Sequence, residues 1–103
     1  MARKVSSESE MQEVFRAAGN RLLVVHFYDD DNHLNKKLRE IAKSSGGSFH
    51  LAEINKFPDP NHPNNKELRK NTDALIEEYM PPSVTSVLVF FRNGQRVKIE
   101  DMH

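Results

Sequence analysis

The first regular pattern in the chain is that of an amphipathic helix. Within residues 6–19, apolar side chains recur at intervals of three and four residues, which places them on one face of an α-helix. Serines and glutamates at 6–10 favour a helix start, and Gly19 favours a helix end. The apolar residues of this face are Met11, Val14, Phe15 and Ala18.

Two continuous apolar runs predict strands that are buried on both faces. Residues 21–28 and 86–91 are short runs rich in β-branched and aromatic side chains, which is typical of central strands in a sheet covered by helices. Alternation of apolar and polar residues predicts further strands at 49–54 and 96–100. Residues 2–5 can add a short edge strand.

Two more segments, residues 33–44 and 66–79, predict the second and third helices. Residues 55–65 contain three prolines, which cannot donate a backbone hydrogen bond, so this segment predicts a loop. The expected buried residues of the second helix are Leu34, Leu38, Ile41 and Ala42. Those of the third helix are Leu68, Ala74, Leu75 and Tyr79.

The order of these elements predicts an α/β fold built on a mixed sheet. A strand–helix–strand unit forms a parallel pair, and Asn93-Gly94 predicts a hairpin that makes the last two strands antiparallel neighbours. Helices are then expected to cover the faces of the sheet. The length suits one domain spanning residues 1–103, with the Pro/Asn-rich segment 55–65 as a loop insertion.

Composition excludes several classes of function. The chain has 15 Lys and Arg residues and 15 Asp and Glu residues, so its neutral formal charge gives no general attraction to nucleic acid or an anionic membrane. It has no cysteine, which excludes disulfides, thiolate nucleophiles and thiolate metal sites. No stretch resembles a secretory signal or a membrane span, so a cytoplasmic or nuclear protein is expected.

Two segments, taken in this order of elements, resemble the thioredoxin family. Residues 18–27 are similar to the exit of that family's first helix and its central strand, and residues 90–97 are similar to its late hairpin. The resemblance covers nearly the whole chain except 55–65 and the end. It implies a thioredoxin-like fold with a central mixed sheet of four to five strands, flanked by helices and lacking the family's C-terminal helix.

The family's redox segment, Trp-Cys-Gly-Pro-Cys-Lys, aligns without a gap with residues 31–36. Both cysteine positions then carry asparagine, at Asn32 and Asn35. In the family the first cysteine is a thiolate nucleophile and the second resolves the mixed disulfide. A carboxamide does neither, so the dithiol–disulfide site is lost, and Asn32 is instead expected to cap the helix.

Two further positions depart from the family's pattern. His26 stands where the family has a buried acid that assists proton transfer at the cysteines. The segment Val84, Thr85, Ser86 lies where the family has a cis-proline, and the register places Thr85 or Ser86 there. For His26, two alternatives stay open, a neutral hydrogen-bonded core histidine and a pH switch.

Other polar groups have ordinary structural interpretations. The acidic run at 29–31 is expected to cap a helix rather than to bind a cation, and the histidines lack the spacing of a zinc motif. The loop at 55–65 is either a passive insertion or a binding loop. No metal site or cofactor is therefore assigned.

The missing terminal helix leaves one face of the predicted sheet uncovered. A bare sheet face exposes apolar area that monomeric proteins avoid. This face is therefore hypothesised to contact a protein partner or to form a homodimer.

These observations favour a redox-inactive, thioredoxin-like protein-interaction module, acting as a scaffold or regulatory subunit. Two alternatives stay open. One is a ribonucleoprotein-associated thioredoxin-like subunit that binds through the lysine-rich flank of the second helix. The other is a non-redox enzyme that uses His33 and nearby acids. No catalytic residue is assigned, and neither a membrane nor, in the leading hypothesis, nucleic acid is an expected partner. The predicted partner-binding residues are Asp31, Asn32, His33, Asn35, Val84, Thr85 and Ser86.

Overall fold

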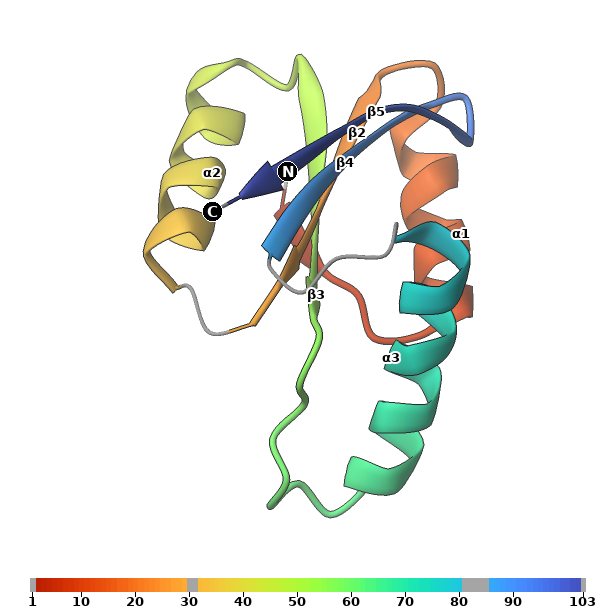
Figure 1. Cartoon of the computed structure of the whole chain (residues 1–103). Helices are drawn as coiled ribbons and strands as arrows, with labels where there is room; N and C mark the ends of the chain where they lie inside the picture. The colour runs from red at the N-terminus through yellow and green to blue at the C-terminus, as the bar shows by residue number, and fades with distance from the viewer. Residues whose placement is uncertain (1, 30–31, 81–85, 103) are drawn as a thin grey trace.

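The computed structural model describes residues 2–29, 32–80 and 86–102 (Figure 1). These residues form the α/β fold that the sequence predicts, including the edge strand near the N-terminus. The elements are β1 (Ala2–Lys4), α1 (Glu8–Ala18), β2 (Leu22–Tyr28), α2 (Asn32–Ser44), β3 (Phe49–Asn55), α3 (Asn65–Tyr79), β4 (Ser86–Arg92) and β5 (Gln95–Met102).

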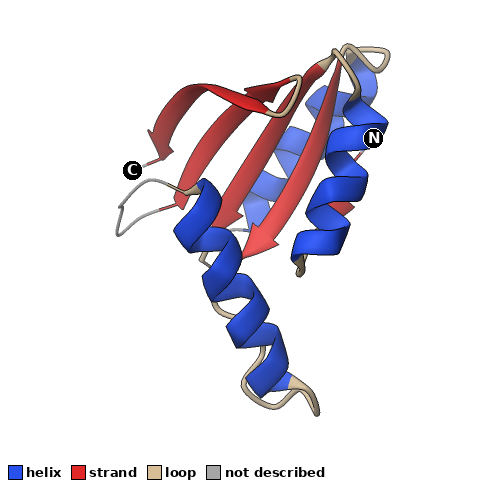
Figure 2. Cartoon of the chain, turned by 90° about the vertical axis from the view of Figure 1, so that its right-hand side faces the viewer, coloured by secondary structure: helices blue, strands red, loops and turns tan. Residues whose placement is uncertain are grey.

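The five strands form one mixed sheet in the order β1-β3-β2-β4-β5. β3 pairs in parallel with both β1 and β2, whereas β4 runs antiparallel to β2 and to β5. Helices lie on both faces, with α1 and α3 on one side and α2 on the other (Figure 2). The predicted mixed sheet flanked by helices is therefore confirmed, with five strands.

Each face of the sheet has its own hydrophobic cluster, because successive side chains of a strand point to opposite faces. The larger cluster, under α1 and α3, includes Met11, Phe27 and Leu75, each with no exposed surface. The smaller cluster, under α2, is centred on Val24 and Leu51. The continuous apolar runs at β2 and β4 thus fill both faces at once, as their composition predicts.

The hairpin between β4 and β5 uses the predicted Asn-Gly turn. Asn93 has a φ of 56° and Gly94 a φ of 77°, the left-handed pair that a two-residue hairpin requires. The pairing shifts by one residue between Phe90 and Phe91, which leaves Val97 as the extra residue of β5.

Two residues expected in the core are exposed instead. Ile41 is 53% exposed, because it lies on the flank of α2 that no described helix covers. Ala74 is also exposed, since Thr72 and Leu75 take the inward positions of α3. The predicted helices are both present, but fewer of their apolar residues are buried than the three- and four-residue spacing predicts.

Side chains at the start of α1 fix its first turn. The Ser7 hydroxyl accepts a hydrogen bond from the backbone N–H of Glu10 at 3.3 Å. The Glu10 carboxylate in return accepts from the backbone N–H and the hydroxyl of Ser6, at 3.0 and 2.8 Å. Burial alone raises the pKa of Glu10, but the Ser6 hydrogen bonds outweigh it, and the net pKa lies below its ordinary value of 4.5.

This lowered pKa gives a pH-dependent contribution to stability. Because the folded state lowers the pKa of Glu10, its contribution is present above the unfolded value and is lost as pH falls through the folded value. Glu10→Gln is expected to reduce the free energy of unfolding at pH 7 by about 0.5 kcal/mol, and by less at pH 3. Urea unfolding at both pH values tests this, with Glu40→Gln on α2 as the control. An equal loss at the two pH values would contradict it.

Candidate functional site

The predicted partner-binding residues belong to two segments of the sequence, residues 31–35 and residues 84–86. Asp31, Val84 and Thr85 lie outside the described residues. Asn32 is the first residue of α2, and the next residue, His33, is exposed.

Ser86, the first residue of β4, lies beside the end of β2. Its half-buried hydroxyl accepts a hydrogen bond from the backbone N–H of Asp29 at 3.3 Å, across 57 residues of sequence. This contact brings the first residue of β4 to the same end of the sheet as the residue that follows β2.

Asn35 lies beneath this region rather than on its surface. It is only 3% exposed, and its side-chain oxygen is 2.7 Å from Nδ1 of His26, which has no exposed surface. With the amide oxygen as acceptor, the His26 Nδ1 carries the proton and donates. His26 is thus a buried, hydrogen-bonded core residue. The position that aligns with the family's second cysteine is occupied by a carboxamide that is committed to the core.

Tyr28 extends this polar group towards the end of β2. Its ring lies 5.4 Å from the His26 imidazole, centroid to centroid. Burial and the nearby Glu53 raise the pKa of the Tyr28 phenol, although a hydrogen bond from Asn35 partly offsets this. The Asn35 amide therefore links the side chains of His26 and Tyr28 on β2. Because its pKa is raised, the Tyr28 hydroxyl stays protonated at neutral pH.

An ion pair that the sequence patterns did not predict lies next to this group, with a buried carboxylate and a guanidinium side chain that is 47% exposed. Glu53 on β3 is directly opposite His26 in the sheet and is 2% exposed. Arg39 on α2 donates from Nε and Nη2 to its two carboxylate oxygens, at 2.6 and 2.5 Å. The only signal in the sequence was a glutamate between the apolar residues of a strand. That pattern is equally typical of a glutamate exposed to solvent.

The arrangement contains no thiol or disulfide, because the chain has no cysteine. Within residues 2–29, 32–80 and 86–102, no three His, Asp or Glu side chains lie close enough to hold a metal ion. No helix of the described chain is both long and apolar enough to cross a membrane. The site therefore offers hydrogen-bonding groups and an exposed imidazole, but no dithiol–disulfide exchange.

Neither a protein family model nor any curated protein matches this sequence. Solved structures of thioredoxins are similar in fold. A germline-specific thioredoxin of Drosophila melanogaster, Deadhead, aligns with 95% of this chain and 84% of its own, at a TM-score of 0.70 and 17% identity. The thioredoxin of Fasciola hepatica aligns with 96% of this chain and 85% of its own, at a TM-score of 0.68 and 16% identity.

A cysteine-to-serine mutant of an Entamoeba histolytica thioredoxin aligns with 99% of this chain and 87% of its own, at a TM-score of 0.69 and 8% identity. At such identities the similarity is one of fold alone. The described chain therefore has a thioredoxin-like fold, a mixed five-stranded sheet flanked by helices, and because it contains no cysteine it has no dithiol–disulfide activity of its own.

Proposed function

We propose that this chain is a redox-inactive protein-interaction module, a scaffold or regulatory subunit with a thioredoxin-like fold. The observation that carries the proposal is the buried contact between Asn35 and His26. It ties the start of α2 to the central strand at the position where the family aligns its resolving cysteine. The hydrogen bond fixes the start of α2 against β2 at residue 35, where no thiol is present. Binding is therefore the function that we propose for the start of α2.

The proposed partner contact is the surface formed by the start of α2 and the start of β4. His33 is exposed there, and Ser86 is half-buried. Asn32, Asp31, Val84 and Thr85 belong to the same two chain segments by sequence. Asn35 supports this surface from beneath, because its side chain is buried.

The test uses the full chain as bait in a native lysate, with bound proteins identified by mass spectrometry. His33→Asp is expected to lose a protein that the wild type retains. Lys43→Gln is the control, because it also lowers the charge by one unit, in the last turn of the same helix. Equal retention by both variants would contradict the proposed contact and direct attention to the loop at 55–65 or to the sheet face. The wild type is also expected to show no turnover in an insulin-reduction assay.

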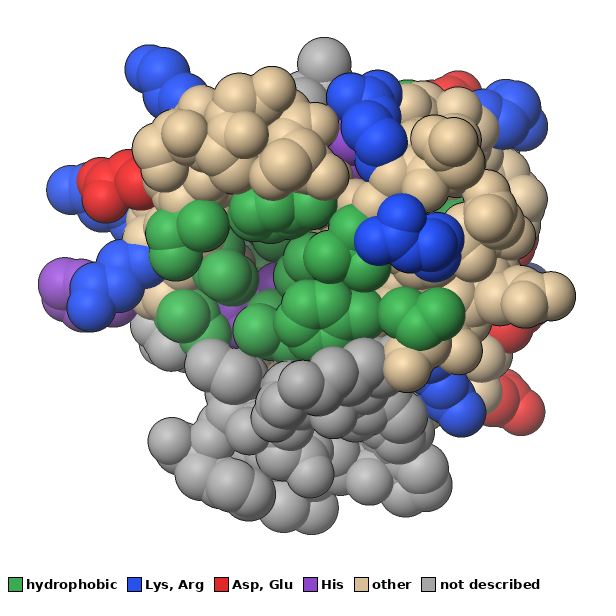
Figure 3. All heavy atoms as spheres, turned by 90° about the horizontal axis from the view of Figure 1, so that it is seen from above, with side chains coloured by type: hydrophobic (Ala, Val, Ile, Leu, Met, Phe, Trp, Pro, Cys, Tyr) green, Lys and Arg blue, Asp and Glu red, His purple; other side chains and the backbone are tan. Residues whose placement is uncertain are grey.

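A second surface, on the α2 side of the sheet, is proposed for self-association. Among the described helices only α2 lies on this face, and it leaves β4 and β5 uncovered (Figures 1 and 2). Figure 3, which views the molecule of Figure 1 from above, shows hydrophobic side chains gathered in the centre of that upper surface. The α2-side apolar surface consists of Leu22, Leu38, Ile41, Phe49 and Phe90.

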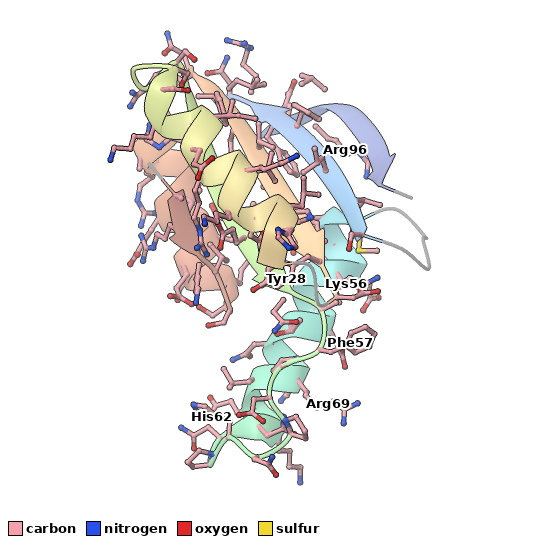
Figure 4. All side chains as sticks on the ribbon, turned by 90° about the vertical axis from the view of Figure 1, so that its left-hand side faces the viewer. Tyr28, Lys56, Phe57, His62, Arg69 and Arg96 are labelled. Atoms are coloured by element: carbon pink, nitrogen blue, oxygen red, sulfur yellow. The ribbon has the colours of Figure 1, made fainter. Side chains whose placement is uncertain are left out.

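Ile41→Glu is expected to shift the protein from dimer to monomer, because a charge brought into an apolar contact must be desolvated. Sedimentation velocity over a range of concentrations measures this. Phe57→Glu is a matched control, since Phe57 is also exposed, at 65%, but projects from the loop far from this surface (Figure 4). A wild-type chain that stays monomeric at high concentration would contradict the proposal.

A further inference from the structure

A cavity of about 270 Å³ opens at the carboxyl ends of the three parallel strands. Lys4, Tyr28 and Asn55 are the last residues of β1, β2 and β3, and all three line it. Figure 4 shows Tyr28 at this lower end of the sheet. The crevice outside the carboxyl ends of parallel strands is the usual ligand-binding place in open α/β sheets. The cavity lies on the β1–β3 side and is separate from the surface at His33 and Ser86.

Thr72 gives this cavity a polar group with unused hydrogen-bonding capacity. The residue is 2% exposed and lines the cavity from α3. Its hydroxyl makes no side-chain hydrogen bond to any residue of the described chain. The hydroxyl opens onto the cavity, so a bound molecule can hydrogen-bond it in place of solvent.

The other free polar groups at the cavity are mainly donors. The Tyr28 oxygen is held by Asn35, which leaves the phenol proton to donate. The side-chain oxygen of Asn55 accepts from the backbone N–H of Phe57 at 2.9 Å, which leaves the amide N–H groups. Lys4 adds an exposed ammonium. A molecule that complements these donors must be rich in acceptors.

The charge at the cavity also favours an anion. Glu53 lines the cavity, but both of its oxygens are bound by Arg39, so its charge is compensated. Lys4 is then the uncompensated charge among the lining residues of the described chain. The remaining wall is formed by the apolar Val5, Pro58 and Leu68 and by Ser6, whose hydroxyl donates to the Glu10 carboxylate.

We propose that this cavity binds a small organic monocarboxylate with a compact apolar body. The carboxylate accepts hydrogen bonds from the hydroxyls of Thr72 and Tyr28 and pairs with the Lys4 ammonium, and the apolar body lies against Leu68 and its neighbours. The volume is below the range of about 300–1,000 Å³ typical of pockets for drug-sized molecules, so the fitting class is small, with benzoate as a suitable probe. None of the described residues of the proposed protein contact lines this cavity.

The test is a titration of the full wild-type chain with benzoate and with benzamide, followed by backbone amide NMR shifts. Benzoate is expected to shift the signals of Thr72, Tyr28 and Lys4, and to bind at least about tenfold more tightly than neutral benzamide. Thr72→Val, which keeps the side-chain shape, is expected to weaken benzoate binding by about tenfold. Lys4→Gln should weaken it similarly, while Lys43→Gln on α2 should leave it unchanged.

Three results would overturn the proposal. They are the absence of shifts at the cavity residues at millimolar benzoate, equal binding of benzoate and benzamide, and unchanged affinity in Thr72→Val. The comparison of the two probes uses the wild type alone, so it remains decisive even if a variant fails to fold.

Discussion

Arg39→Met is expected to lower the free energy of unfolding by about 3 kcal/mol. The substitution leaves the Glu53 carboxylate, whose side chain is 1% exposed, without the guanidinium that binds both of its oxygens. Although the Arg39 side chain is half exposed, removing it leaves the buried carboxylate without its compensating charge, which costs more than the pair contributes. Urea unfolding at pH 7 measures the loss.

The double variant Arg39→Met/Glu53→Met is expected to recover most of this stability. Replacing both charges by apolar side chains removes the desolvation cost together with the attraction. Lys37→Met, an exposed position on the same helix, is the control and should change stability by less than about 0.5 kcal/mol. If the single Arg39 variant were as stable as this control, the ion pair would have no structural role.

Asn32→Cys/Asn35→Cys is expected to create a disulfide and a measurable insulin-reducing activity in a chain that has none. Side chains three residues apart on a helix are neighbours, and the helix N-terminus lowers the pKa of a thiol there. α2 begins at Asn32, so the first introduced thiol would lie at that terminus. Insulin reduction in the presence of a dithiol reductant measures the gain.

The single variant Asn32→Cys is the control, because it has the attacking thiol but no resolving partner. It should remain inactive in the same assay. A double variant whose two thiols stay free under oxidising conditions would show that residues 32 and 35 do not occupy the geometry of the family's redox pair. That result would remove the basis for aligning them with the two cysteines.

Strands and turns were predictable where the signal is local. The apolar run of β2 fills both hydrophobic clusters, and Asn93-Gly94 adopts the backbone conformation that its residue types favour. Helix caps are equally local, so the first turn of α1 lies where Ser7 and Glu10 predict it. In each case the interacting groups are within a few residues of one another.

Burial was harder to predict where it depends on a partner elsewhere in the chain. Glu53 is buried only because Arg39, 14 residues earlier, neutralises it from another element. Ile41 shows the reverse case, since an apolar position on a correct helical face stays exposed where no helix of the described chain covers the sheet. The cavity at the strand ends combines residues of β1, β2, β3 and α3, and no single segment carries its signal.

The site residues illustrate both cases. The identity of residue 35 was enough to exclude thiol–disulfide exchange at that position, because that conclusion depends only on the atoms of the side chain. Its role in the fold was not apparent, since the hydrogen bond to His26 requires α2 to pack on β2. The loss of thiol exchange at residue 35 was therefore predictable from the sequence, whereas the structural role of its side chain, which depends on packing, was not.

The two margins of the sheet differ in their propensity to nucleate fibrils. β1 offers only three residues at one margin, all exposed, and two of them are the cations Arg3 and Lys4. So short and charged a margin gives an incoming strand few backbone groups to pair with and repels another copy of itself. β5 is eight residues long, and its irregular pairing beside Val97 is the main interruption to a regular template there. Amyloid-like growth by strand addition is therefore expected to start from β5 rather than from β1.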